Sequence, residues 1–133
     1  MNLYKRVLLK LGSFTNGRTR VFLYKKAGMR IGNNVQIASG IHVDRPEGVT
    51  IGDNCFINHY VHFHNGANPE ATITIGNNVF LGPEVKFICA THEMGDSDKR
   101  AGKNKYGSIT VEDGTWIGAC TTILPGAVIS RGG

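Results

Sequence analysis

The chain has 133 residues, of which 41% are hydrophobic and 19% are charged, a composition typical of one globular domain. Glycine is frequent at 18 residues, but four prolines and the lack of a three-residue glycine period exclude a collagen-like or disordered chain. No apolar run reaches the roughly 18 residues that span a bilayer, and the N-terminus lacks a signal-peptide cleavage site, so we expect a cytoplasmic protein.

The net charge of +5 is concentrated in the first thirty residues, which carry eight basic side chains and no acid. Apolar residues recur at helical spacing before Gly12, and a second apolar group precedes Gly28, which predicts two short helices in a basic segment 1–28. The basic side chains are either solvated, with the apolar stripe of the helices packed on the rest of the protein, or they contact an anionic membrane surface. Nucleic acid is not expected as a partner, because no aromatic residues alternate with the basic ones.

Three cysteines, Cys55, Cys89 and Cys120, are an odd number without paired spacing. This pattern indicates neither a disulfide framework nor a zinc site. We expect all three to be buried as small apolar side chains.

A six-residue period organises the chain from residue 31 onward. Neither a helical period nor simple strand alternation produces steps of six. Every position at these steps, within four groups, carries a large apolar residue: Ile31, Ile37, Val43, Ile51, Ile57, Phe63, Ile75, Leu81, Phe87, Val111, Ile117, Ile123 and Ile129.

The hexads predict an all-β solenoid over residues 29–133, in which each coil consists of short strands joined at corners. Four groups open with IGNNV, IGDNC, IGNNV and VEDGT, and glycine and asparagine suit corners because they tolerate positive φ. About four coils result, with their apolar positions pointing inward. The residues left over form loops near 45–48, 66–71 and, as the longest, 93–108.

The segment ATHEMGDSDKRAG, followed by ITVEDGTWIGACTTILPGAVI, carries the most specific pattern: a histidine, a polar loop, then Trp-Ile-Gly and Leu-Pro-Gly. In this order the chain resembles the hexapeptide-repeat acyltransferases, in particular the galactoside, maltose and polysaccharide O-acetyltransferase branch, over about residues 18–129. The resemblance implies a left-handed parallel β-helix and a homotrimer with active sites at subunit interfaces. It also implies acetyl-CoA as cosubstrate and a sugar or surface polysaccharide unit as acceptor.

His92 matches the catalytic position of this family and is our candidate general base. Acetyl transfer from a thioester to an alcohol needs a base for the hydroxyl proton and donors for the developing oxyanion. An ordinary histidine is largely neutral at physiological pH and suits the first role. Cys89, three residues earlier, suggests a Cys-His acyl-enzyme pair, but its place in the hexad favours packing.

Asn58 matches an asparagine that the family uses to hold the acceptor, although by its position alone it is a corner residue. His59 and His64 are expected to line the acceptor cleft. Together with His62 they form a string that suits zinc, but His62 repeats the hexad position of His42, which favours outward-facing stacked side chains. We therefore expect no metal.

The Trp-Ile-Gly coil supplies the remaining candidates. The resemblance places Trp116 beside the active-site tunnel, and packing against a neighbouring subunit is the alternative. Gly118 and Ala119 are expected at the acetyl-CoA site, where the backbone N–H of Ala119 would donate to the acetyl carbonyl. The loop 93–108 is either solvated or a flap over a neighbouring subunit's site.

Family members continue past the Leu-Pro-Gly coil with further coils that grip CoA, whereas this sequence ends at Ile129-SRGG. The leading expectation is an acetyl-CoA-dependent O-acetyltransferase. One alternative is a catalytically silent trimeric hexapeptide-repeat scaffold, or a fragment lacking the full CoA site. A metal-dependent enzyme of carbonic-anhydrase type is another, and it would need histidines converging across a subunit boundary.

Overall fold

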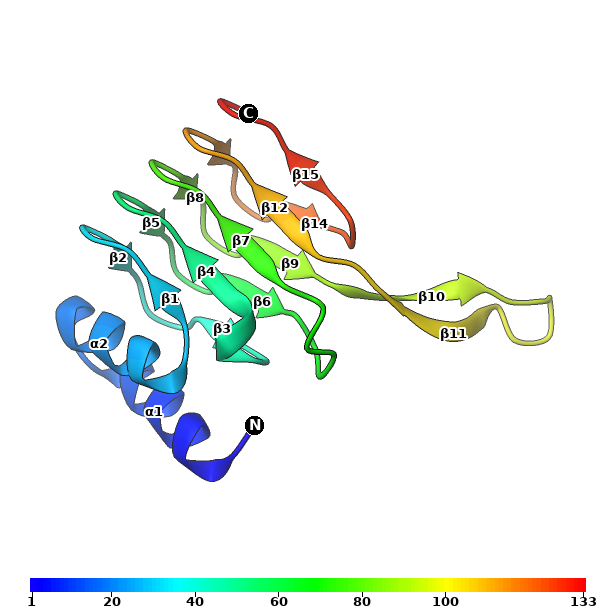
Figure 1. The fold of residues 1–133 in the computed structure, drawn as a ribbon, viewed down its shortest axis with the longest axis horizontal. Helices are drawn as coiled ribbons and strands as arrows, with labels where there is room; N and C mark the ends of the chain where they lie inside the picture. Colours follow the sequence, from blue (N-terminus) through cyan, green and yellow to red (C-terminus); the bar gives the residue numbers. More distant parts are fainter.

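The computed structural model describes all residues from 1 to 133. Helices α1 (Leu3–Phe14) and α2 (Gly17–Ala27) pack against each other at the N-terminal end of the β-helix (Figure 1). Asn2 and Asn16 cap them, because each side-chain oxygen accepts a backbone N–H three residues on. Neither helix has the length and apolar character needed to cross a membrane.

Three parallel sheets form the walls of the solenoid, and a hairpin extends from it (Figure 1). Sheet A contains β1 (Arg30–Ile31), β4 (Val49–Ile51), β7 (Ile73–Ile75), β12 (Ile109–Val111) and β15 (Val128–Ile129). Sheet B contains β2 (Gln36–Ile37), β5 (Phe56–Ile57), β8 (Phe80–Leu81) and β13 (Trp116–Ile117). Sheet C contains β3 (His42–Val43), β6 (His62–His64), β9 (Lys86–Ile88) and β14 (Thr122–Ile123). The hairpin pairs β10 (Ala90–Met94) with β11 (Ala101–Tyr106), and a 3₁₀ turn, η1 (Pro46–Gly48), precedes β4.

The apolar positions of the hexads form the core, as predicted. They lie in register from coil to coil, and all are buried except the first and the last, Ile31 and Ile129, which are partly exposed at the two ends. Between β6 and β9 the rings of Phe63 and Phe87 stack with centroids 5.3 Å apart. The all-β solenoid predicted from the six-residue period is therefore confirmed, and its sheets are parallel, as the resemblance implied.

The motif that opens each coil owes its composition to one corner. Asp53 Oδ1 accepts the N–H of Asn33, and Asn77 Oδ1 accepts the N–H of Asp53, both at 2.8 Å. A Cβ on Gly52 would lie 2.4 Å from Asn77 Oδ1, so only glycine fits before the polar residue. In the first three coils a glycine therefore precedes Asn33, Asp53 or Asn77, and side-chain oxygens link each coil to the next; the fourth coil has Glu112 at the glycine position.

Cys55 and Cys89 are buried, as expected, but the prediction for Cys120 was wrong, because its side chain is exposed. Cys120 occupies a corner with φ 62°, in the left-handed region. Tyr60 and Glu84 occupy the same corner in the preceding coils, at φ 59° and 60°. Sequence patterns that look for Gly or Asn do not find these corners.

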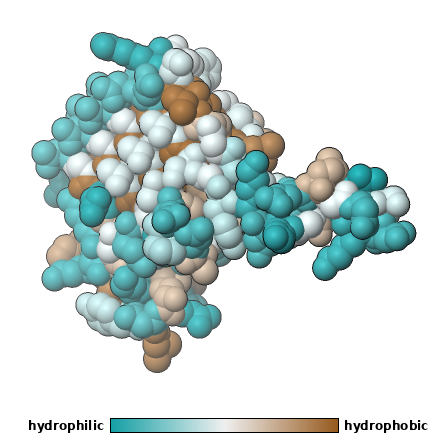
Figure 2. Space-filling model, turned by 45° about the vertical axis from the view of Figure 1, so that its right-hand side comes forward, coloured by the Kyte–Doolittle hydropathy of each residue, from teal (hydrophilic) through white to brown (hydrophobic).

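The segment expected as the loop 93–108 is instead mainly an antiparallel hairpin. Strands β10 and β11 pair from Ala90 with Tyr106 to Met94 with Ala101. Figure 2 shows the hairpin as an arm that projects from the body with a mostly hydrophilic surface. The short apolar repeat of the coils is interrupted here, so the hexad pattern gave no signal for these strands.

Candidate functional site

His92 lies on β10 with its imidazole exposed and one nitrogen fixed. Its Nδ1 is 3.1 Å from the carbonyl oxygen of Gly102 on β11. A carbonyl oxygen can only accept, so this hydrogen bond requires the proton on Nδ1 and leaves Nε2 as the unprotonated nitrogen of the neutral ring. The hairpin thus presents Nε2 as a base.

The local backbone explains this contact. The strand register shifts between two pairs, His92 with Asn104 and Met94 with Ala101. Over this interval β10 advances by two residues and β11 by three. Such an irregularity re-aims side chains and is frequent beside functional sites. A Cβ on Gly102 would lie 2.8 Å from the carbonyl oxygen of Glu93, so a glycine is required for the two strands to approach this closely.

The corner between sheets B and C gathers most of the other predicted residues. The N–H of Asn58 donates to the carbonyl of Leu81 at 3.2 Å, and the N–H of Gly82 donates to that of Ile117 at 2.8 Å, which stacks Asn58, Gly82 and Gly118 in one column. Asn58 and Gly118 are two coils apart, about 10 Å at the usual strand spacing. We call residues 58–59, 82–83 and 118–119 the B–C corner.

Polar groups at the B–C corner remain available for a ligand. Asn58 Oδ1 accepts the N–H of His59 at 2.8 Å, whereas the amide nitrogen of Asn58 has no hydrogen-bond partner. His59 Nδ1 lies 3.0 Å from Ser39 Oγ. The backbone N–H of Ala119 makes no hydrogen bond within the chain, and a Cβ on Gly118 would meet no atom within 4 Å.

Trp116 lies on β13, two residues before Gly118, and 72% of its surface is exposed. Its register partner on β8 is Phe80, which stacks in turn on Phe56 with centroids 5.0 Å apart. The indole therefore extends an aromatic column on the outer face of sheet B.

The single chain does not bring His92 to the B–C corner. The corner lies where the strands of sheet C begin, whereas the hairpin leaves the solenoid after β9, where they end (Figure 1). His64 also lies at this far end, on β6. The predicted residues thus form two groups, with Asn58, His59, Gly118 and Ala119 in one and His92 apart from it.

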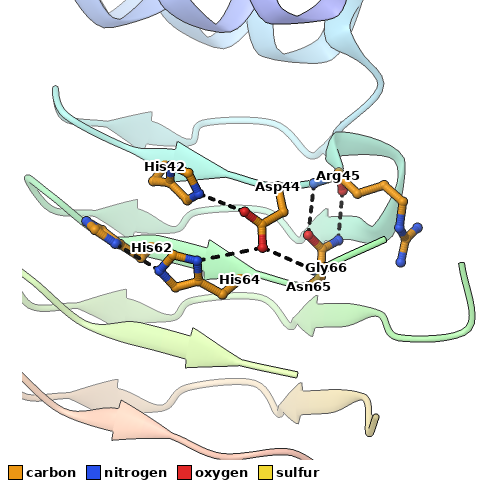
Figure 3. A network of polar contacts seen from close by, with 7 residues as sticks. All are labelled: His42, Asp44, Arg45, His62, His64, Asn65 and Gly66. Atoms are coloured by element: carbon orange, nitrogen blue, oxygen red, sulfur yellow. Dashed lines mark hydrogen bonds and ion pairs between the residues drawn. The ribbon is translucent and has the colours of Figure 1, made fainter. Parts of the chain in front are cut away.

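A second polar group lies on sheet C between the first two coils (Figure 3). His42 Nε2 is 2.7 Å from Asp44 Oδ1, His64 Nδ1 is 3.6 Å from Asp44 Oδ2, and His62 Nδ1 is 3.1 Å from His64 Nε2. We call His42, Asp44, His62 and His64 the histidine cluster. The sequence analysis expected stacked, outward-facing histidines here, with His64 lining the acceptor cleft, and it missed Asp44. The offset of twenty between Asp44 and His64 equals that between His42 and His62.

The charges of the cluster are set by its own members. Burial raises the pKa of Asp44, but the hydrogen bonds from His42 and the Gly66 N–H, with the nearby histidine charges, outweigh it and hold that pKa below its usual value. Burial, followed by the neighbouring His64 and His42, lowers the pKa of His62. The cluster therefore holds an anionic Asp44 and a His62 that favours the neutral form.

Asn65 adjoins this cluster and was also missed. Its fully buried amide accepts the N–H of Arg45 at 3.0 Å and donates to the Arg45 carbonyl at 2.7 Å (Figure 3). The Arg45 guanidinium donates to the carbonyls of Asn68 and Ala71. These bonds close the turn that the sequence predicted as a loop near 66–71.

A surface depression of about 920 Å³ lies between α2 and the first coil and contains none of the predicted site residues. A depression of about 820 Å³ is lined by His42, Asp44, Arg6, Glu47 and Gly66. His92 lines neither of these two depressions.

No protein-family model matches the chain. The galactoside O-acetyltransferase of Lactococcus lactis is 32% identical over 72 residues, which are 54% of this chain and 35% of that protein. The matched segments span about a third of the length of the curated relatives.

Solved structures match over almost the whole chain. A hexapeptide-repeat-containing acetyltransferase from Vibrio cholerae, in complex with acetyl-CoA, superposes with a TM-score of 0.83 and 26% identity, covering 97% of this chain and 69% of that one. A maltose O-acetyltransferase from Clostridium difficile superposes with a TM-score of 0.71 and 26% identity, covering 97% and 72%. The homologues and structural neighbours of this chain are hexapeptide-repeat acetyltransferases.

Proposed function

We propose that the chain transfers acetyl from acetyl-CoA to a hydroxyl of a sugar or surface polysaccharide unit, with His92 as general base. The observation that carries this proposal is the contact of His92 Nδ1 with the Gly102 carbonyl, because it leaves Nε2 ready to take a proton. The acetyl-CoA complex of the Vibrio cholerae neighbour supports the choice of donor.

In this proposal His92 Nε2 removes the proton of the acceptor hydroxyl while the oxygen attacks the thioester carbonyl. Ala119 N–H donates to the oxyanion that develops on that carbonyl. His92 then returns its proton to the departing sulfur of CoA, so that protons balance over the cycle. The unpaired N–H of Ala119 and the open space at Gly118 fit the close approach of a thioester to backbone.

The acceptor would be held at the B–C corner and at Trp116. The unpaired amide nitrogen of Asn58 can donate to a sugar hydroxyl, and His59 can donate or accept beside it. The exposed indole of Trp116 offers a flat apolar face to a sugar ring. His64 is left out of this acceptor site, because both of its ring nitrogens face other members of the histidine cluster.

A complete site would then form between copies of the chain. His92 lies at one end of sheet C and the B–C corner at the other, so the hairpin of one copy would carry its base to the corner of a neighbour. The homotrimer and the left-handed winding that the resemblance implies belong to this proposal, as does the count of about four coils that the hexads predict.

An acetyl-transfer assay that follows CoA release against a panel of sugars tests the proposal. His92→Ala should lower turnover by about 10²- to 10⁴-fold, the effect expected for loss of a general base. Thr91→Ala is the matched control, because neighbouring side chains on a strand point to opposite faces. Equal turnover by His92→Ala and the parent chain would refute the assignment. A complete lack of CoA release with every acceptor would favour the silent scaffold.

The basic helices would make the peripheral membrane contact that their charge suggests. On α1 the exposed side chains of Leu3, Val7 and Leu11 accompany Arg6 and Lys10. Apolar and basic side chains together suit an anionic lipid surface. Co-sedimentation with anionic vesicles, but not with neutral ones, is expected, and Arg6→Glu combined with Lys10→Glu should abolish it. Equal sedimentation with neutral vesicles would contradict this contact.

A further inference from the structure

The histidine cluster contains a set of ligand atoms that acetyl transfer does not use. His42, Asp44 and His64 each offer one atom, and these atoms lie within 4.8 Å of one another. They come from two successive coils, because β3 carries His42 and β6 carries His64. The rigid register of sheet C therefore holds them together without any ligand.

We propose that His42, Asp44 and His64 bind a divalent transition-metal ion, with zinc as the first candidate. Two imidazole nitrogens and one carboxylate oxygen suit zinc and its neighbours in the first transition series, whereas magnesium and calcium prefer sites made of oxygen alone. A tetrahedral zinc ion with bonds of about 2.0 to 2.1 Å separates its ligand atoms by roughly 3.4 Å. To reach that spacing, side-chain adjustments would move His42 Nε2 and Asp44 Oδ1, now 2.7 Å apart, away from each other, and would bring the more widely separated ligand atoms closer together.

The groups around these ligands match the outer shell of a metal site. A histidine ligand usually donates its second ring nitrogen to an acceptor, which fixes the ring. His64 Nε2 lies 3.1 Å from His62 Nδ1, so it can donate there while Nδ1 turns to the metal. Asp44 Oδ2 accepts the Gly66 N–H at 3.1 Å, which orients the carboxylate. His62 thus acts as a positioning residue.

The charge and exposure of the site also fit a cation. Asp44 supplies a carboxylate ligand, and the Arg45 guanidinium is engaged by the carbonyls of Asn68 and Ala71. His42 and Asp44 line the depression of about 820 Å³, and their side chains are 50% and 30% exposed. With three protein ligands, the remaining position of the ion would face this depression and take water or a small anion.

Zinc titration into the chelator-treated full chain, followed by calorimetry and by metal analysis after dialysis, tests the site. We expect one ion per chain and a rise in melting temperature with zinc. His42→Gln and His64→Gln should each abolish both effects. His59→Gln is the matched control, because it removes an exposed histidine outside the cluster, and it should bind as the parent chain does.

Replacement of His62, the positioning residue, should change zinc affinity only in part. His62→Gln should weaken zinc binding by about 10- to 100-fold without abolishing it, as changes in the outer shell do. Cobalt in place of zinc should give visible absorption bands that disappear in His64→Gln. Circular dichroism of every variant without metal verifies that the fold is kept, and His42→Gln is the mildest change because His42 is half exposed.

Three results would overturn the proposal. The first is no retained zinc, and the second is an equal loss of binding in His59→Gln and His64→Gln. The third is a ratio of one ion to two or three chains, which would place the ligands between copies. None of these readouts depends on acetyl transfer, so the metal site and the proposed function can fail separately.

Discussion

His92 Nδ1 donates to the Gly102 carbonyl across the hairpin at 3.1 Å. The bond joins two strands that the coil pattern does not contain, and it determines which nitrogen of His92 can act as a base. Its acceptor is a backbone atom, so the orientation of the ring depends on the path of β11 and not on another side chain.

Gly102→Ala should disturb this bond. The new Cβ would lie 2.8 Å from the Glu93 carbonyl oxygen, so the strands must separate or shift. We expect kcat for acetyl transfer to fall by at least about tenfold with little change in KM, because the base is misplaced while the substrate sites remain. Steady-state kinetics measures both constants.

Gly17→Ala is the control for Gly102→Ala, because its Cβ would meet no atom within 4 Å. It should leave both constants unchanged. A Gly102→Ala chain with parent kcat would show that the position of the imidazole does not depend on this close approach.

Asn65→Ala should destabilise the β-helix by about 2 to 3 kcal/mol. The substitution removes the fully buried amide of Asn65 and leaves the partly buried N–H and carbonyl of Arg45 without their partners, which is costly. Urea unfolding followed by circular dichroism measures the change. The exposed Asn104→Ala is the control and should alter stability by less than about 0.5 kcal/mol. Equal midpoints for the two variants would contradict this role of Asn65.

Arg20→Met should loosen the helices from the solenoid. The buried guanidinium of Arg20 donates to the carbonyls of Gly12, Thr15 and Ile37 at 2.6 to 2.8 Å, so it joins both helices to β2. We expect the free energy of unfolding to fall by about 2 kcal/mol, which is in the range for hydrogen bonds from a charged group. Hydrogen exchange should increase in α1 and α2 before the sheets, and unchanged exchange there would count against the idea. Arg18→Met, an exposed change on the same helix, is the control.

The ion pair between Lys5 and Glu47 should make stability depend weakly on pH. Their charged atoms are 3.0 Å apart. Burial raises the pKa of Glu47, but its backbone hydrogen bond and the Lys5 ammonium outweigh this and hold that pKa below its usual value. A lowered pKa stabilises the fold above the unfolded value of about 4.3, and this contribution disappears as the pH falls through the folded value.

Glu47→Gln removes this carboxylate and should reduce the loss of stability below about pH 4.3. The effect should stay within about 1 kcal/mol, because the pair is solvent-exposed. Thermal unfolding at a series of pH values checks it. Parallel stability curves for Glu47→Gln and the parent chain would refute the linkage.

The sequence predicted the solenoid because its signal is periodic. Positions such as Ile57 and Leu81 recur at fixed steps, and a buried ladder requires an apolar residue at each one. The hairpin had no such signal, because its strands pair with each other outside the core and almost all of their residues are exposed.

The candidate site was predicted only in part for a related reason. His92 and Asn58 were found through the resemblance, whereas Asp44 and Arg20 act through contacts with residues far along the chain. Arg20 looked like one of many basic residues in the N-terminal segment. Its burial follows from how α2 packs on β2, which no local pattern encodes.

Whether this chain binds the proposed donor is decided by calorimetric titration of acetyl-CoA into the purified chain, with the oligomeric state measured by light scattering on the same sample. We expect a trimer that binds about one acetyl-CoA per chain, with weaker binding when Ala119 is replaced by proline, which has no N–H. Binding by Thr91→Ala should match that of the parent chain. A folded oligomer that binds no acetyl-CoA would contradict the proposed function.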